Sequence, residues 1–169
     1  MALVSLDSNI CIWGIKEQCT KGQEIQKEKA KKLIKRLYKA KHNIILPSPV
    51  ISEILSPMPN NEAAVLYAKI IRKFEIGYMD TAASLILSKI LNYNYKLAKP
   101  NYKDIGITKT CMKYDAYITS IAIAAKAECI FTNDTKDFKS LVGNFIEIKG
   151  LDEMPSSDEL LKNMKNEEE

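Results

Sequence analysis

The chain has 169 residues, 46% of them hydrophobic and 27% charged, a balance that is typical of one globular domain and argues against intrinsic disorder. No apolar run approaches the length that crosses a bilayer, and the N-terminus lacks the basic segment of a signal peptide, so we expect no membrane partner and a cytoplasmic location. The net charge of +4 divides into +9 over residues 1–150 (23 basic, 14 acidic) and −5 over residues 151–169 (2 basic, 7 acidic).

Short apolar runs alternate with helical patterns along the chain. Apolar runs predict strands over residues 3–6, 44–46, 76–79, 129–132 and 145–148. Helical spacing of apolar residues predicts helices after the first strand and over residues 23–41, 48–56, 60–74, 80–95, 114–127 and 136–142. Strands that alternate with helices form a mostly parallel sheet that is covered on both faces. The sequence therefore predicts an α/β fold.

Several polar residues predict where helices begin. Ser48 can cap the third predicted helix, with Pro49 in its first turn, and Asp80 can cap a later one, whereas either Asn60 or Asn61 can cap the helix between them. Residues 96–113 are predicted to form a loop with room for one helical turn. Residues 156–159 form a capping box. We expect one domain over residues 1–150 and an acidic tail with a short helix over 151–169.

Four acidic residues stand at the ends of apolar runs: Asp7, Glu53, Asp115 and Asp134. Asp7 and Asp134 follow predicted strands, where sites collect in open parallel sheets. Asp115 is predicted at a helix start and Glu53 in the second turn of a helix, so both can face the same crevice. Each acid also has an ordinary structural role as a helix cap or as the partner of a distant lysine.

A cluster of these acids would need a cation. Two carboxylates about 4 Å apart repel by about 4 kcal/mol at an effective dielectric constant of about 20. Oxygen ligands without His or Cys select Mg²⁺ or Mn²⁺, and such ions activate water for the hydrolysis of phosphodiesters. A cationic body steers a polyanionic substrate to the cluster, although a solvated lysine-rich helix explains the charge equally well. Asp137 is a possible fifth ligand.

Polar residues flank the acids, namely Ser8, Asn9, Thr132 and Asn133. They could hold metal-bound water or a phosphate oxygen, and they could equally be simple turn formers. The cysteines form no Cys-x-x-Cys pair and the only histidine, His42, has no ligand-like neighbour, so we expect reduced thiols and no zinc site. Catalysis would then depend on carboxylates and a metal.

Four motifs, in this order and at these spacings, resemble those of PIN-domain ribonucleases: residues 6–10, 52–54, 115–118 with the alanine-rich segment after them, and 132–138. The resemblance runs from about residue 3 to residue 148 and is greatest to the toxin components of prokaryotic VapBC toxin–antitoxin pairs. It implies a three-layer α/β/α sandwich with a five-stranded, mostly parallel sheet. It also implies an endoribonuclease that depends on Mg²⁺ or Mn²⁺, forms homodimers and is inhibited by an antitoxin.

The same resemblance assigns roles to individual residues. Asp7, Glu53, Asp115 and Asp134 would be catalytic metal ligands, with Asp137 as an auxiliary acid. The lysine-rich segment 16–32 and the acidic tail depart from the family pattern, so an RNA-processing nuclease outside a toxin–antitoxin pair is an alternative. The acidic tail is expected to lie over the cationic groove or over the basic surface of a partner.

Other protein classes fit less well. A phosphatase of the haloacid dehalogenase type needs a second Asp two residues after the first, where this chain has Asn9. A dinucleotide-binding enzyme needs a glycine-rich turn after the first strand, and Asp7-Ser8-Asn9 contains no glycine. A non-catalytic module that binds RNA or a protein partner remains an alternative, although all four motif acids are present.

Overall fold

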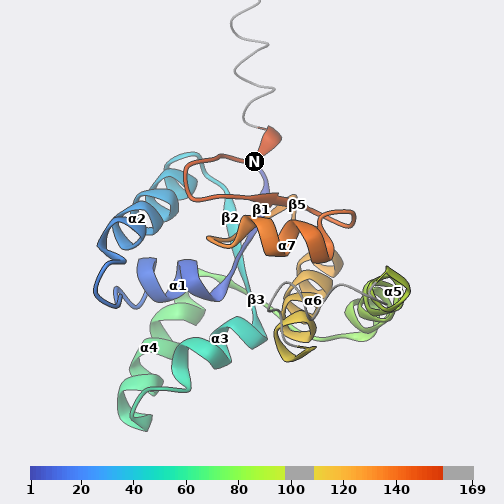
Figure 1. The fold of residues 1–169 in the computed structure, drawn as a ribbon. Coiled ribbons are helices and arrows are strands. Elements are labelled where there is room, and N and C mark those ends of the chain that lie inside the picture. The colour runs from blue at the N-terminus through green and yellow to red at the C-terminus, as the bar shows by residue number, and fades with distance from the viewer. Residues whose placement is uncertain (98–108, 158–169) are drawn as a thin grey trace, which may run out of the picture.

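In the part of the chain that the computed structural model describes, residues 1–97 and 109–157, five strands form a single sheet (Figure 1). All four strand pairs are parallel, and the strand order is β3-β2-β1-β4-β5. The strands are β1 (Leu3–Leu6), β2 (Asn43–Pro47), β3 (Glu75–Gly77), β4 (Cys129–Phe131) and β5 (Glu147–Lys149). The predicted five-stranded parallel sheet is thereby confirmed.

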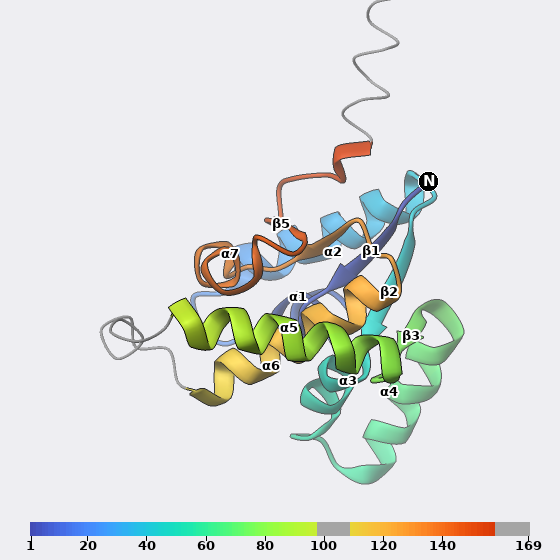
Figure 2. The same ribbon diagram turned by 90° about the vertical axis from the view of Figure 1, so that its right-hand side faces the viewer.

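Helices cover both faces of the sheet. They are α1 (Ser8–Gly14), α2 (Glu24–Lys39), α3 (Ser48–Leu55), α4 (Asn60–Lys73), α5 (Thr81–Leu97), α6 (Lys109–Ala124) and α7 (Thr135–Val142). In Figure 1, α1 and α2 lie on one side of the strands, and α5 and α6 lie on the other. Figure 2 shows α5 packed along α6, outside it with respect to the sheet. The fold is the predicted three-layer α/β/α sandwich.

The apolar residues of the strands and of the inner helix faces form the core. Leu6 on the central strand β1 and Ile130 and Phe131 on its neighbour β4 are fully buried, as are Leu33 of α2 and Ile118 of α6. Burial of each such side chain contributes about 1.5–3 kcal/mol. Within the described residues, no helix is both long enough and apolar enough to span a membrane.

The strand order places a crevice between β1 and β4. The chain builds outward from β1 through β2 to β3 and then crosses to the other side of β1 to form β4. Leu6 is in register with Phe131, and the backbone amide of Asp7 donates to the carbonyl of Phe131 at 3.0 Å. The segments that follow β1 and β4 therefore leave the sheet side by side, and ligands bind at such a switch point in open α/β sheets.

The helix after the long connection begins earlier than predicted. The sequence predicts a start near Tyr114, but α6 begins at Lys109, which places Asp115 inside the helix and not at its N-terminus. The polar residues that precede Asp115 suggest a loop when taken alone, whereas the structure continues α6 through them, and this helix packs against α5 and the sheet. The remainder of the predicted loop, residues 98–108, lies outside the described residues.

Two predicted caps are wrong and one is confirmed. The cap position of α3 is Pro47, because β2 continues to that residue, and the cap position of α4 is Pro59; neither residue forms a side-chain cap. Asp80 does cap α5, since its Oδ1 accepts a hydrogen bond from the amide of Ala83 at 2.7 Å. Glu53 lies in the second turn of α3, as predicted.

Both edge strands are shifted from their predicted positions. Strand β3 ends at Gly77, two residues before the predicted end, and the apolar residues Tyr78 and Met79 continue beyond it on the surface. Strand β5 begins two residues later than predicted, because Phe145 and Ile146 pack against the core from the preceding turn. Hydrophobicity alone does not distinguish these positions from strand.

The start of the acidic tail packs on the cationic helix α2. Leu151 is buried, and its carbonyl accepts a hydrogen bond from Nη2 of Arg36 at 2.7 Å. Asp152 forms a salt bridge with Lys29 at 2.6 Å. Residues 158–169, which include most of the predicted C-terminal helix, lie outside the described residues. The domain boundary at residue 150 stays a prediction.

Candidate active site

Asp7 lies directly after β1 and is held by two hydrogen bonds. The residue is only 7% exposed. The amide of Ser8 donates to Oδ1 at 2.7 Å, and the hydroxyl of Thr132 donates to Oδ2 at 2.9 Å. Both carboxylate oxygens are thereby fixed in position, one by the start of α1 and the other by the segment after β4.

Thr132 joins two of the predicted site residues. Its hydroxyl donates to Asp7 and accepts a hydrogen bond from the backbone amide of Asp134 at 3.1 Å. Thr132 itself is fully buried behind Asp7. Asp134 occupies the N-terminal cap position of α7, but its side chain forms no capping hydrogen bond. Asp134 is exposed. Thr132 is thus a positioning residue.

Glu53 approaches the site from α3, which begins directly after β2. The hydroxyl of Ser8 donates to Oε2 of Glu53, so the start of α1 contacts both Asp7 and Glu53. Glu53 is otherwise exposed. Asp115 approaches from α6 and is half-buried. The four acids therefore come from four segments that are far apart in the sequence.

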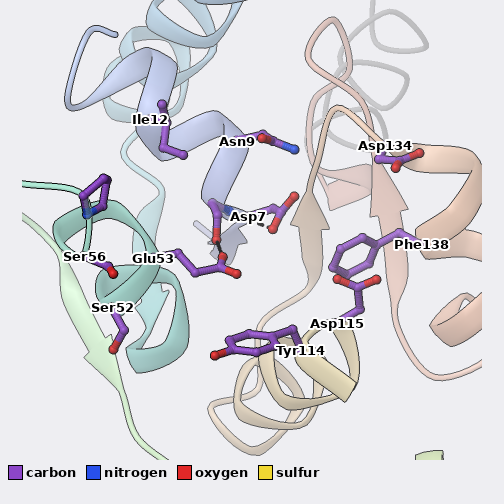
Figure 3. A pocket seen from close by; sticks show the side chains of 12 residues that line it. Asp7, Asn9, Ile12, Ser52, Glu53, Ser56, Tyr114, Asp115, Asp134 and Phe138 are labelled. Carbon is purple, nitrogen blue, oxygen red and sulfur yellow. Dashed lines mark hydrogen bonds between the residues drawn. The ribbon is translucent and has the colours of Figure 1, made fainter. Parts of the chain in front are cut away.

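All four acids line one pocket of about 630 Å³. Figure 3 shows Asp7 at its centre, Glu53 on the α3 side, Asp115 on the α6 side and Asp134 at the start of α7. The other lining residues are Ser8, Asn9, Ile12, Ser52, Ser56, Pro57, Tyr114 and Phe138. The structure thus brings together four acids that are separated by up to 127 positions (134 − 7) in the chain.

Three other predicted site residues do not line this pocket. Thr132 lies behind Asp7, and Asp137 is half-buried on α7. Asn133 lines a different, smaller pocket together with Lys29 and Asp152. Ser8 and Asn9 do line the acid pocket, as the sequence suggested.

Sequence reasoning missed several pocket-lining residues that neighbour the acids. Tyr114 precedes Asp115, and Ser52 precedes Glu53. Phe138 lies one helical turn after Asp134, and four-residue spacing on a helix puts two side chains on the same face. That spacing could have identified Phe138 from the sequence.

Burial makes Asp7 a weaker acid than an exposed aspartate. Loss of hydration is the main cause that raises the pKa of its carboxyl from 3.8 to about 6. The hydrogen bonds from Thr132 and Ser8 lower this pKa, and the negative charges of Glu53 and Asp134 raise it. A cation in the pocket would stabilise the ionised form.

Asp115 has the higher pKa of the two acids. Burial raises the pKa of its carboxyl from 3.8 to about 7, and the charges of Asp7, Asp134, Glu53 and Asp137 add to this increase in that order. The acids are thus close enough to repel one another electrostatically. This repulsion is the property that a bound divalent cation relieves.

The four acids surround the pocket without meeting at one point. Among residues 1–94 and 113–157, whose side chains are described, no three His, Cys, Asp or Glu side chains stand close enough together to hold a metal ion. The predicted shared location is therefore observed, whereas a preformed cluster is not. The donor set nevertheless fits Mg²⁺ or Mn²⁺, because its ionisable ligands are all carboxylates and the pocket is open to solvent.

The described histidine and cysteine side chains do not line the acid pocket. His42 precedes β2, at the opposite end of the strand from α3, and its Nδ1 accepts a hydrogen bond from the amide of Ala2 at 3.0 Å. Cys11, Cys19 and Cys129 are free thiols, as predicted. Burial raises the pKa of the Cys129 thiol to about 12, so this thiol is not a ready nucleophile.

Replacing Thr132 with valine should raise the pKa of Asp7 above about 6, because valine keeps the volume of the side chain but removes the hydrogen bond that stabilises the carboxylate. A ¹³C NMR titration of the Asp carboxyls in the metal-free protein measures this pKa. Thr119→Val is the matched control, since the buried Thr119 hydroxyl on α6 has no hydrogen-bond partner among the described residues. An unchanged pKa of Asp7 in Thr132→Val would show that the hydroxyl does not support the carboxylate.

Solved structures of similar fold include several from toxin–antitoxin systems. The chain is similar to VapBC2 from Rickettsia felis, solved bound to a promoter DNA fragment, with a TM-score of 0.61 and 20% identity over 88% of this chain and 98% of the other. It is similar to VapBC-1 from nontypeable Haemophilus influenzae, with a TM-score of 0.63 and 15% identity over 89% and 99%. Mycobacterium tuberculosis VapC20, a toxin that cleaves the sarcin–ricin loop, has a TM-score of 0.53 and 12% identity over 86% and 98%.

These identities are low, and the likenesses establish the fold alone. No curated protein sequence matches the chain significantly. The sequence profile of the PIN domain matches residues 4–143, which is 140 of the 169 residues and spans all four acids of the pocket. Both the sequence match and the α/β/α architecture thus lead to one conclusion: the chain belongs to the PIN domain family.

Proposed function

We propose that the protein is an endoribonuclease that depends on Mg²⁺ or Mn²⁺ and hydrolyses RNA phosphodiester bonds. The observation that carries this proposal is the single pocket lined by Asp7, Glu53, Asp115 and Asp134 at the carboxyl edge of a PIN-domain sheet. Mutually repelling carboxylates at such an edge, of which Asp7 is buried and Asp115 half-buried, cost folding free energy, and a catalytic metal site explains why they are present.

The pocket acids would hold the metal, with Asp137 as an auxiliary acid. A bound divalent ion supplies a nucleophilic hydroxide at neutral pH and stabilises the charge on the phosphodiester oxygens. Asp7 is the most rigid ligand, because both of its oxygens are fixed by hydrogen bonds. Asp115, with its pKa of about 7, must lose its proton when a cation binds.

Polar residues around the acids would orient the substrate. The hydroxyl of Ser8 holds the Glu53 carboxylate toward Asp7. Asn9 lies on the exposed rim, where its side-chain amide could donate to a phosphate oxygen. The net charge of +9 over residues 1–150 would attract the RNA backbone at long range.

A role as the toxin of a toxin–antitoxin pair is the biological setting we propose. Chains in two VapBC structures have similar folds, and VapC20, whose fold is also similar, is a toxin that cleaves the sarcin–ricin loop. In this setting an antitoxin would be the protein partner, and the protein would form a homodimer. A growth arrest on expression that Asp7→Asn abolishes would distinguish this setting from that of an RNA-processing enzyme.

The direct test of the proposed activity is cleavage of RNA by the purified protein. Single-stranded and structured RNAs should be cut in the presence of Mg²⁺ or Mn²⁺ and remain intact in EDTA. Restoration of cleavage by adding metal back would exclude loss of the protein itself. Tight RNA binding without cleavage under every metal condition would instead identify a non-catalytic RNA-binding module.

A further inference from the structure

A second pocket opens beside the acid pocket. Its volume is about 560 Å³, and it is lined by Ser48, Pro49, Ser52, Lys113, Tyr114 and Tyr117. Ser52 and Tyr114 line both pockets, so the two share a wall. Figure 3 shows the ring of Tyr114 between Asp115 and Ser52, with its hydroxyl directed toward α3. A polymer that passes through the acid pocket on this side therefore meets the second pocket next.

The walls of this second pocket are partly aromatic. Tyr114 and Tyr117 are 43% and 39% exposed, and their three-residue spacing puts both rings on one face of α6. Pro49 lies on α3, so that the pocket is formed between the two helices. Single exposed tyrosines are ordinary on a protein surface, but two that line one pocket next to a phosphodiester site are not explained by packing.

Polar groups complement these aromatic walls. Lys113 is exposed at the pocket and carries a positive charge that suits a phosphate group. The hydroxyl of Ser52 donates to the carbonyl of Ser48 at 3.2 Å, which leaves its oxygen available as an acceptor. Aromatic rings, a cation and hydroxyl groups are the elements that bind single-stranded nucleic acid by stacking its bases.

We infer that this pocket receives an unstacked base of single-stranded RNA, next to the phosphodiester group that lies in the acid pocket. This inference rests on the proposed nuclease function and deepens it, because the base pocket would select the nucleotide beside the cleaved bond. Tyr117 is the principal stacking residue, since it lines only the second pocket. Tyr114 contacts both pockets and Lys113 binds the RNA backbone.

The position and charge of the pocket favour a nucleobase over a protein side chain as its occupant. The pocket joins the acid site directly, so its occupant and the reacting phosphate belong to one molecule if that molecule is RNA. Lys113 adds positive charge at this pocket, which lies next to the acids and favours the polyanion over a basic peptide. A protein segment that binds here is the competing outcome of the test below.

The test measures RNA affinity in a background that cannot cleave. Asp7→Asn protein is combined with Tyr117→Ala, Tyr117→Phe or Tyr67→Ala, and fluorescence anisotropy reports the binding of a short, labelled single-stranded RNA and of an abasic RNA of equal length. Tyr67 is the matched control, because it is 42% exposed on α4 and lines neither pocket. Circular dichroism verifies that each variant is folded.

Tyr117→Ala should weaken binding of the base-containing RNA by about 5- to 150-fold, the loss that corresponds to one stacked base. Tyr117→Phe should retain the affinity, Tyr67→Ala should have no effect, and the abasic RNA should bind all variants equally. Equal binding of base-containing RNA by Tyr117→Ala and the parent would overturn the inference. A change in assembly state without a change in RNA affinity would also overturn it and assign the pocket to a protein partner.

The outcome for the base pocket is distinguishable from that for the nuclease activity. If the wild-type protein cleaves RNA with metal but Tyr117→Ala leaves affinity unchanged, only the base pocket is wrong. If the wild-type protein cleaves no RNA, the proposed function fails, and equal binding of base-containing and abasic RNA would reject the base pocket as well.

Discussion

Asp7→Asn and Asp115→Asn should each reduce metal-dependent RNA cleavage by at least about a thousandfold. The metal contributes several kcal/mol to stabilisation of the transition state, and each 1.36 kcal/mol corresponds to about a factor of ten in rate. Asparagine preserves the shape of the side chain but removes the charge that would hold the cation. Initial cleavage rates at saturating Mg²⁺ or Mn²⁺ measure this effect.

The control for this prediction is Asp152→Asn, which removes the same charge at an exposed site on the tail. Asp152 pairs with Lys29 and does not line the acid pocket. This variant should cleave RNA at the wild-type rate. Cleavage by Asp7→Asn or Asp115→Asn at the wild-type rate, with contaminating nuclease excluded, would refute the assignment of these residues to the active site.

Asp115→Asn should make the metal-free protein more stable at neutral and alkaline pH, by on the order of 1–3 kcal/mol. The pKa of Asp115 is about 7 in the folded protein and 3.8 ordinarily, so at intermediate pH the folded protein holds a proton that the unfolded chain has released. The free energy of unfolding of the wild type therefore falls as pH rises from about 4 to about 7, and it stays low above this range. Asp115→Asn has no carboxyl group at this position, so its free energy of unfolding does not fall for this reason as the pH rises.

Denaturant unfolding in EDTA across this pH range measures the free energy of unfolding of the wild type and of Asp115→Asn. The advantage of Asp115→Asn should disappear below about pH 4, where the carboxyl is protonated in both states. Asp152→Asn removes an exposed salt bridge and should leave the stability unchanged or slightly lower. A wild-type stability that rises with pH over this range, or a destabilised Asp115→Asn, would contradict the raised pKa of Asp115.

The meeting of the acids in one pocket is predictable in part from the sequence. Asp7 and Asp134 follow apolar runs, and parallel strands place their carboxyl ends at one edge of the sheet. Glu53 lies in the second turn of a helix that begins immediately after β2, so its distance from this edge is short. These three positions depend on local pattern and topology, and both are readable from the sequence.

The remaining features depend on tertiary packing. The helix α6, which begins at Lys109, contacts the preceding helix α5 and also the strand β2, which lies far away in the sequence, and the local pattern of the sequence shows neither contact. The direction of Asn133, which lines another pocket, depends on the path of the chain between β4 and α7. The second pocket is formed where α3 and α6 meet, and the sequence does not show that Pro49 and Tyr117 lie there together.

The central claim is that the acid pocket binds a divalent cation. Crystals of the protein soaked in Mn²⁺ and measured at the manganese absorption edge test it most directly. We expect an anomalous peak in the pocket lined by Asp7, Glu53, Asp115 and Asp134, and no such peak in Asp115→Asn. A pocket without manganese in the wild type at saturating Mn²⁺, or an equal peak in the variant, would contradict it.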